Sequence, residues 1–333
     1  MTELTIHNTR GPALDTVHRV HAAVCAADGK LVASSGDAQH VSIMRSAAKP
    51  FQALPLAEDG VVERYAITGE ELALACASHN SEVRQVELVR GLLTRIGLSE
   101  EDLACGPHPP LARDFGVRPD RSAKRAELAE PSRLASNCSG KHTGMLALAL
   151  HNGWETAGYH VSGHPVQERA LGVLARYAGM HESDIGLGVD GCGVVTFSLP
   201  LAGIARAFAA FGADRTPAAR TIAGAMMQHP EFVAGQWRLD TELMQAYPGE
   251  LLVKVGAEGM YCAALPGHGL GIALKVEDGS SRAAMPALLR VLDALRLEPV
   301  PSASLRRFSE LAVLNTRFEQ VGVMRAEGGV EFA

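Results

Sequence analysis

The stretch Arg45-Ser46-Ala47-Ala48-Lys49-Pro50 places a serine and a lysine three residues apart, immediately before a proline. Residues three apart on a helix share one face, and proline is readily tolerated only in the first turn of a helix. The stretch therefore predicts a helix that begins near Ser46 and ends near Asp59-Gly60. The pair is either a nucleophile with its base or an ordinary helix N-terminus with a surface lysine, and the spacing alone leaves both open.

Two later motifs favour the catalytic interpretation. Ser78-His79-Asn80 contains Ser-x-Asn, and Lys254-Val255-Gly256 contains Lys-x-Gly in an apolar run that is typical of a strand. Ser-x-x-Lys, Ser-x-Asn and Lys-x-Gly follow one another in the order found in serine β-lactamases, penicillin-binding proteins and their glutaminase relatives. The chain resembles that superfamily in layout, although His79 and Val255 stand where the β-lactamase motifs have Asp and Thr.

Both ends of the chain predict antiparallel strands. Residues 17–35 read as a hairpin around the turn residues Asp28-Gly29-Lys30. Near the other end, three short β-favouring runs (251–255, 260–265 and 270–276) are joined by glycine-containing turns, which predicts a meander. A final helix is expected from about Arg282 to Leu295. We expect the hairpin and the meander to share one sheet.

The middle of the chain is mainly helical. The expected helices cover residues 68–77, 82–96, 143–151, 165–177, 201–211, 217–228 and 238–246, with another helix start at Ser99 and a strand-like run over 186–197. Residues 106–135 lack a clean period and predict a long loop, which in a compact domain is usually functional. The pattern predicts one α+β domain over 1–333, with helices flanking the sheet and a helical region inserted. Other α+β folds fit the pattern as well.

The composition excludes several classes of protein. The chain has 333 residues, of which 47% are hydrophobic and 20% charged, which is enough apolar sequence for a sizeable core. The net charge is −6 and there is no basic stripe, so we expect no nucleic-acid partner. No apolar run approaches the ~20 residues of a membrane span, and Met1-Thr2-Glu3-Leu4 lacks the features of a signal peptide. We therefore expect a cytoplasmic protein without a membrane partner.

Disulfides are disfavoured in the cytoplasm. We therefore expect the six cysteines to be buried, catalytic or metal-bound thiols. Cys138 and Lys141 are three residues apart, and Cys192 lies in a glycine-flanked turn after a strand. Thiolates favour zinc, but two cysteines are too few for a structural site and an amine ligand must first lose its proton. The alternative is two buried cysteines beside a lysine at a helix start. Asp190 is either a turn residue or a carboxylate that holds an amino group.

Several longer motifs together resemble one family. They are Arg10-Gly11-Pro12, Arg45-Ser46-Ala47-Ala48-Lys49-Pro50, Ala77-Ser78-His79-Asn80, Cys105-Gly106-Pro107-His108-Pro109-Pro110, Asn137-Cys138-Ser139-Gly140-Lys141-His142, Asp190-Gly191-Cys192-Gly193 and Lys254-Val255-Gly256-Ala257-Glu258-Gly259. The chain resembles the rhizobial-type, or class 3, L-asparaginases of the asparaginase II family over nearly its whole length.

The resemblance implies an enzyme that hydrolyses L-asparagine to L-aspartate and ammonia on a glutaminase/β-lactamase-like fold, usually as a homodimer. It implies two Ser–Lys tandems, Ser46–Lys49 and Ser78–Lys254. It also implies a Zn²⁺ ion bound by two cysteines and a lysine, matched here by Cys138, Cys192 and Lys141. One departure is Asp240, which stands where some members have a further active-site cysteine, so the role of that cysteine does not carry over.

Acyl-transfer chemistry and this alignment together predict a mechanism. Ser46 attacks the side-chain carboxamide and Lys49 takes its proton, while Lys254 lowers the pKa of Lys49 and Ser78 relays a proton. The backbone N–H of Ser46 is expected to contribute to the oxyanion hole.

Substrate binding is expected to involve five residues. Arg45 suits the α-carboxylate of the substrate, and Asp190 and His142 suit its amino-acid head group. His79 and Asp240 complete the predicted substrate-binding set, and His79 is also the alternative base. Arg45 could equally be a surface arginine, and His142 a helix-start residue.

Three rival functions remain open at this stage. A glutaminase would use the same machinery, because one methylene of substrate length is worth only ~1–3 kcal/mol in a pocket. A penicillin-recognising enzyme would act outside the cytoplasm, which conflicts with the absence of a signal peptide. A non-catalytic protein that binds zinc or an amino acid would not need both Ser–Lys tandems.

Overall fold

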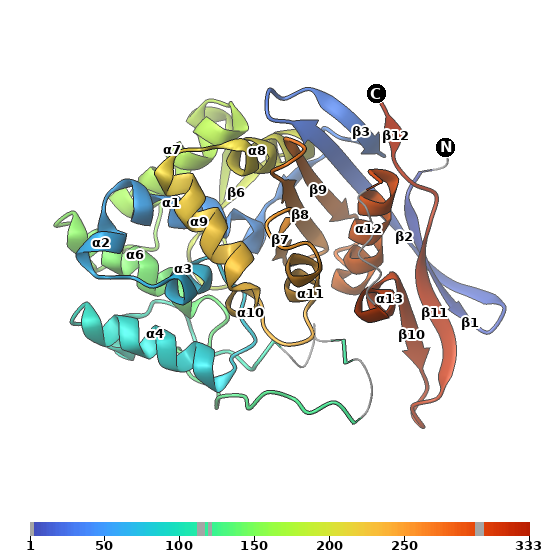
Figure 1. Ribbon diagram of the computed structural model, residues 1–333, viewed down its shortest axis with the longest axis horizontal. Coiled ribbons are helices and arrows are strands. Elements are labelled where there is room, and N and C mark those ends of the chain that lie inside the picture. The colour runs from blue at the N-terminus through green and yellow to red at the C-terminus, as the bar shows by residue number, and fades with distance from the viewer. Residues whose placement is uncertain (1–2, 112–116, 119–121, 297–302) are drawn as a thin grey trace.

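A nine-stranded sheet organises the computed structural model, which describes residues 3–111, 117–118, 122–296 and 303–333. Its main path runs β10-β11-β1-β2-β9-β8-β7, and β3 pairs with both β2 and β12. The strands are β1 (Thr5–Arg10), β2 (Ala13–Ala26), β3 (Leu31–Ser35), β7 (Leu252–Gly256), β8 (Met260–Leu265), β9 (Leu270–Val276), β10 (Glu310–Leu314), β11 (Gln320–Glu327) and β12 (Glu331–Phe332). Figure 1 shows this sheet on one side of the molecule, with both termini at its outer edge.

The predicted union of hairpin and meander is confirmed. Strand β2 pairs antiparallel with β9 from Val20 opposite Val276 to Ala26 opposite Leu270. Strand β2 begins at Ala13, earlier than expected, because its first half pairs with β1, a strand that the sequence reading did not include. The predicted loop Arg10-Gly11-Pro12 forms the turn between these two strands. No prediction covered the three C-terminal strands.

The inserted region is helical, as expected, and Figure 1 shows it beside the sheet. The helices are α1 (Lys49–Glu58), α2 (Val61–Arg64), α3 (Gly69–Ala75), α4 (Val83–Arg95), α6 (Ser139–His151), α7 (Pro165–Ala178), α8 (Leu201–Ala213), α9 (Pro217–Gln228), α10 (Pro230–Val233), α11 (Leu239–Ala246), α12 (Ser281–Ala294) and α13 (Ala303–Ser309). Capping boxes at Thr68 and Glu82 explain why α3 and α4 begin where they do. Part of the predicted 106–135 loop lies outside the described residues.

One local prediction was wrong. The helix start at Ser99 yields only one 3₁₀ turn (Glu100–Asp102), because the chain becomes extended at Leu103 and soon meets Gly106-Pro107. The strand-like run over 186–197 is two strands, β5 (Gly186–Val189) and β6 (Val195–Pro200), separated by the expected glycine-flanked turn that holds Cys192. With β4 (Val41–Ile43) they form a separate three-stranded sheet in the order β4-β6-β5.

The hydrophobic core joins the sheet to the helical region. Helix α8 packs on β9 and β2, and α12 packs on β11 and β9. Helix α1 is enclosed by α6, α7 and α9, so every residue from Lys49 to Leu56 is buried. Within the described ranges, none of the helices combines the length and the apolar character that crossing a bilayer would require. The core thus holds the start of α1 against the edge of the main sheet.

Candidate active site

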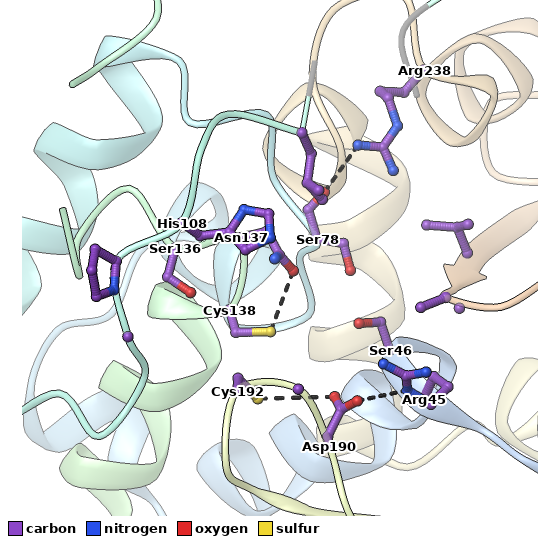
Figure 2. A pocket seen from close by; sticks show the side chains of 17 residues that line it. Arg45, Ser46, Ser78, His108, Ser136, Asn137, Cys138, Asp190, Cys192 and Arg238 are labelled. Atoms are coloured by element: carbon purple, nitrogen blue, oxygen red, sulfur yellow. Dashed lines mark hydrogen bonds and ion pairs between the residues drawn. The ribbon is translucent and has the colours of Figure 1, made fainter. Parts of the chain in front are cut away.

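A cavity of about 380 Å³ opens where the helical region meets strand β7. The predicted residues Arg45, Ser46, Ser78, Cys138, Asp190 and Cys192 all line it. They come from four separate segments, and Figure 2 shows the hydroxyl groups of Ser46 and Ser78 pointing into the same space. The structure therefore brings together motifs that lie far apart in the chain, from Arg45 to Cys192.

The segment around Ser46 is a 3₁₀ helix (Arg45–Ala48) that runs directly into α1, so Pro50 lies in the first turn of α1 as predicted. Arg45 has a φ of 51°, a left-handed conformation that is uncommon for a residue with a side chain. Gly256 of the Lys-x-Gly motif lies against this segment, where a Cβ would come within 2.8 Å of the Met44 carbonyl oxygen. A glycine there lets β7 approach the serine closely.

Both predicted lysines contact Ser78. Lys49 Nζ and Lys254 Nζ each lie 3.0 Å from Ser78 Oγ. Lys49 also donates to the Ala77 carbonyl, and Lys254 donates to the Val255 carbonyl at 2.8 Å. The Ser78–Lys254 tandem is thus in contact, whereas no hydrogen bond joins the side chains of Ser46 and Lys49 within the described part of the chain. Ser46 is the more exposed of the two serines and Ser78 is buried.

Burial of Lys254 sets its charge. The side chain is fully buried, and this desolvation, with the nearby Lys49 and Arg238 cations, lowers its pKa from 10.5 to about 7. Asp240 acts in the opposite direction but does not cancel the effect. A neutral lysine amine has a free lone pair. Near neutral pH, Lys254 can therefore accept the Ser78 proton while Lys49 donates to the same hydroxyl oxygen.

The two predicted histidines are buried and lie behind the cavity wall. His79 Nδ1 accepts from the Ser81 backbone N–H at 3.1 Å, so Nε2 carries the proton and faces Ser139 Oγ at 2.9 Å. His142 Nδ1 meets the Tyr159 hydroxyl at 2.6 Å. Desolvation lowers the pKa of each imidazole to about 3, so both are neutral. Neither side chain lines the cavity.

Asp240 is fully buried at the start of α11. Its carboxylate accepts from the Val255 backbone N–H at 2.8 Å and from the Tyr261 hydroxyl at 2.6 Å. The hydrogen bond to Val255 holds strand β7 in place at the residue that follows Lys254. Asp240 therefore lies behind the cavity, where its negative charge acts on Lys254 and its hydrogen bonds hold the backbone.

Arg45 and Asp190 form an ion pair at the mouth of the cavity (Figure 2), with Arg45 Nε 2.7 Å from Asp190 Oδ1. Burial opposes a charge on Asp190, but Lys141 and Arg45 outweigh it and hold the pKa of the carboxyl below its usual value. Glu258 Oε1 lies 3.8 Å from the same guanidinium. The mouth thus offers both a cation and carboxylates to an incoming zwitterion.

Cys138, Lys141 and Cys192 converge beside this ion pair. Lys141 Nζ lies 3.1 Å from Cys192 Sγ, and the Cys138 thiol donates to Asn137 Oδ1 at 3.3 Å. The neighbouring Cys138 and the Lys141 charge lower the pKa of Cys192 to about 5, whereas the neighbouring Cys192 and burial raise the pKa of Cys138 to about 12. Desolvation opposes charge on Lys141, but the two sulfurs raise its pKa overall.

These three side chains fit a zinc ion in donor chemistry, because zinc accepts sulfur and nitrogen ligands and three of them leave a fourth position open. Among the described residues there is no cluster of three or more His, Cys, Asp or Glu side chains suited to a metal. The candidate set here has only two cysteines and depends on a lysine as its third ligand.

The sequence reading missed other residues of the cavity wall. Arg238, Asn137 and His108 line it, and Arg238 is buried. Asn137 and His108 stand inside motifs that the resemblance had already marked, so they could have been found. Arg238 follows a stretch without any recognised motif, and no sequence signal pointed to it.

Comparisons with known proteins support one family. The family model described as L-asparaginase II matches residues 6–326. The comparison with curated proteins gives no match. Three similar solved structures are Mglu in its native form, a β-lactamase from Mycobacterium bovis and a class C β-lactamase.

Their similarity to this chain is low. Mglu is 16% identical with a TM-score of 0.45, over 86% of this chain and 66% of its own, so this chain spans slightly less than two thirds of Mglu. The M. bovis protein is 12% identical with a TM-score of 0.36, over 78% and 87%. The class C enzyme is 13% identical with a TM-score of 0.35, over 77% and 86%.

Proposed function

Because the chain belongs to the L-asparaginase II family, we propose that it is an amidohydrolase that converts L-asparagine to L-aspartate and ammonia through an acyl-serine intermediate. One observation carries the proposal. The cavity holds an accessible serine, Ser46, next to a second serine whose hydroxyl lies 3.0 Å from two buried lysines. Serine becomes a nucleophile when a nearby base takes its proton, and a buried lysine with a lowered pKa is such a base.

In the proposed mechanism the Ser46 hydroxyl oxygen attacks the carboxamide carbon. Its proton passes through the Ser78 hydroxyl to the neutral Lys254 amine, and then to the departing nitrogen, which leaves as ammonia. Water repeats the sequence on the acyl-serine and releases L-aspartate. Lys49 holds the Ser78 oxygen by donating to it. This assignment moves the base from Lys49, the original prediction, to Lys254, because Lys254 contacts Ser78 and burial lowers its pKa to about 7.

The residues at the mouth of the cavity would bind the amino-acid head group of the substrate. Arg45 keeps N–H groups beyond the one that Asp190 accepts, and these suit an α-carboxylate. Asp190 is ionised and can accept from the α-ammonium. His79, His142 and Asp240, which were also predicted to bind substrate, would act indirectly through the backbone and residues that they hold.

A Zn²⁺ ion is part of the proposal. Cys138, Lys141 and Cys192 would hold it, and when bound it would supply a positive charge that strengthens binding of the substrate head group. Lys141 has to lose its proton to bind the ion. The homodimeric state and the cytoplasmic location stay predictions of the same kind.

Ammonia release tests the proposal directly. Purified protein is incubated separately with L-asparagine, L-glutamine and a β-lactam, and ammonia and β-lactam opening are measured. We expect turnover of L-asparagine above the other two. Greater turnover of L-glutamine would make the enzyme a glutaminase, β-lactam opening would make it a penicillin-recognising enzyme, and no turnover of any compound would favour a non-catalytic binding protein.

A further inference from the structure

Arg238 lies in the turn before α11, and its side chain reaches the cavity although only 2% of the residue is exposed. The turn has an unusual backbone, with a φ of 124° at Gly235 and 64° at Trp237. Gly235 cannot carry a side chain, because a Cβ there would lie 2.5 Å from Asn80 Nδ2. The turn therefore packs tightly against the Ser-x-Asn motif.

Hydrogen bonds join this turn to Ser78. Arg238 donates from one terminal nitrogen to the Ser78 carbonyl at 3.3 Å and to Asn80 Oδ1 at 3.1 Å, and Figure 2 shows Arg238 beside Ser78. The Asn80 amide nitrogen donates to the Gln236 carbonyl and to Glu82 Oε1, both at 3.0 Å. Asn80 is thereby fixed by the turn and is not a lining residue of the cavity. Arg238 thus connects the turn before α11 to the segment that contains Ser78 and Asn80.

The charges around Lys254 come from several elements. Lys49 of α1 and Arg238 are the cations that disfavour a proton on Lys254, and Asp240 of α11 favours one. Three thiols also face it: Cys138 before α6, Cys76 after α3 and Cys262 of β8. Burial raises the pKa of the Cys76 and Cys262 thiols, and the neighbouring Cys192 together with burial raises that of Cys138, so all three are neutral at physiological pH. Arg238 is the cation in this group that cannot be deprotonated in a protein.

We propose that Arg238 is a positioning residue for the proposed amide hydrolysis, which fixes the Ser78 backbone through its carbonyl and places a permanent cation beside the Ser78–Lys254 pair. The inference rests on the proposed function, since it matters for turnover only if Ser78 and Lys254 take part in it. Like charges in a low-dielectric site repel strongly. A permanent cation therefore keeps the lysine available as a base at lower pH than burial alone would allow.

Three variants separate charge from packing. Arg238→Lys keeps the positive charge with altered geometry, and Arg238→Gln removes the charge. Arg238→Met also removes the charge and keeps an unbranched apolar stem. Arg317→Gln, in an exposed turn between β10 and β11, is the charge-matched control. The measurement is kcat/KM for ammonia release against pH, with far-ultraviolet circular dichroism to verify folding.

We expect the midpoint of the acidic limb to move up by roughly one pH unit in Arg238→Gln and Arg238→Met. It should stay at the wild-type value in Arg317→Gln and close to it in Arg238→Lys, even where kcat falls. An unchanged midpoint in both Arg238→Gln and Arg238→Met would overturn the electrostatic role. If Arg238→Gln does not fold, Arg238→Met decides alone, because it leaves no unpartnered amide in the buried site.

A second readout does not need turnover. Lys254 takes up a proton when the chain unfolds, so the stability of wild type rises with pH above the native pKa of Lys254. In Arg238→Gln this rise should begin at higher pH. If wild type releases no ammonia, the proposed function fails, while this stability measurement still supports or refutes the effect of Arg238 on Lys254.

Discussion

Replacing Lys254 by methionine should stabilise the protein at neutral and acidic pH. Lys254 is fully buried, and its amine is lost in the variant while most of the side-chain volume is kept. The native pKa is about 7 compared with 10.5 for the free side chain. At 1.36 kcal/mol per unit, this shift corresponds to about 5 kcal/mol of unfavourable folding free energy.

The sign follows from proton binding. Below pH 7 the lysine is protonated in both the native and the unfolded state, so wild type bears the full cost of burying the charge. Between pH 7 and 10.5 the unfolded state holds more protons, so the stability of wild type rises with pH. Methionine does not titrate, so its advantage should shrink by up to about 5 kcal/mol across this range. The lost hydrogen bonds, worth ~1 kcal/mol each, are a pH-independent offset.

Urea unfolding of wild type and Lys254→Met from about pH 6 to about pH 10 measures this difference. Lys30→Met is the matched control, because Lys30 is exposed in the turn after β2 and its substitution should leave the pH dependence unchanged. A difference between Lys254→Met and wild type that stays constant over the whole range would refute a lowered native pKa. It would also remove Lys254 as the proposed base.

Three further perturbations have defined outcomes. Asp240→Asn should destabilise the fold by ~2–4 kcal/mol in urea unfolding, because an amide cannot accept well from both Tyr261 and the Val255 N–H; an unchanged midpoint would contradict this. Asp190→Asn should raise KM for L-asparagine by at least ~10-fold with a smaller fall in kcat, and an unchanged KM would exclude Asp190 from head-group binding. Elemental analysis should find about one zinc per chain, lost in Cys192→Ala; protein that stays metal-free after zinc addition, with its thiols reduced, would contradict the metal site.

Much of the fold could be predicted from local sequence signals. The meander followed from short apolar, β-favouring runs and glycine turns, and most helices followed from caps and apolar spacing. Strand β1 and the three C-terminal strands were missed. Strand β1 pairs with β11 and β12 pairs with β3, so these pairings join opposite ends of the chain, where no local turn signals them. The turn that holds Asp190 and Cys192, in contrast, was visible as a glycine cluster and lies between β5 and β6.

The site shows a similar division. Chemistry-bearing motifs identified the residues Ser46, Ser78, Cys138, Asp190 and Cys192, all of which line one cavity. The sequence could not tell which serine each lysine would contact, because residues three apart on a helix share a face without necessarily bonding. It could not separate cavity residues from buried supports such as Asp240 either. That distinction depends on tertiary packing.

The central claim, acylation of Ser46, is tested most directly by mass spectrometry of protein that is acid-quenched during turnover of L-asparagine. The account predicts a mass increase of one β-aspartyl group, which maps to the peptide containing Ser46 and is absent in Ser46→Ala. Ser46→Ala should also release no ammonia while keeping the wild-type fold. An adduct on Ser78, or near-normal turnover by Ser46→Ala, would contradict the assignment of Ser46 as the nucleophile.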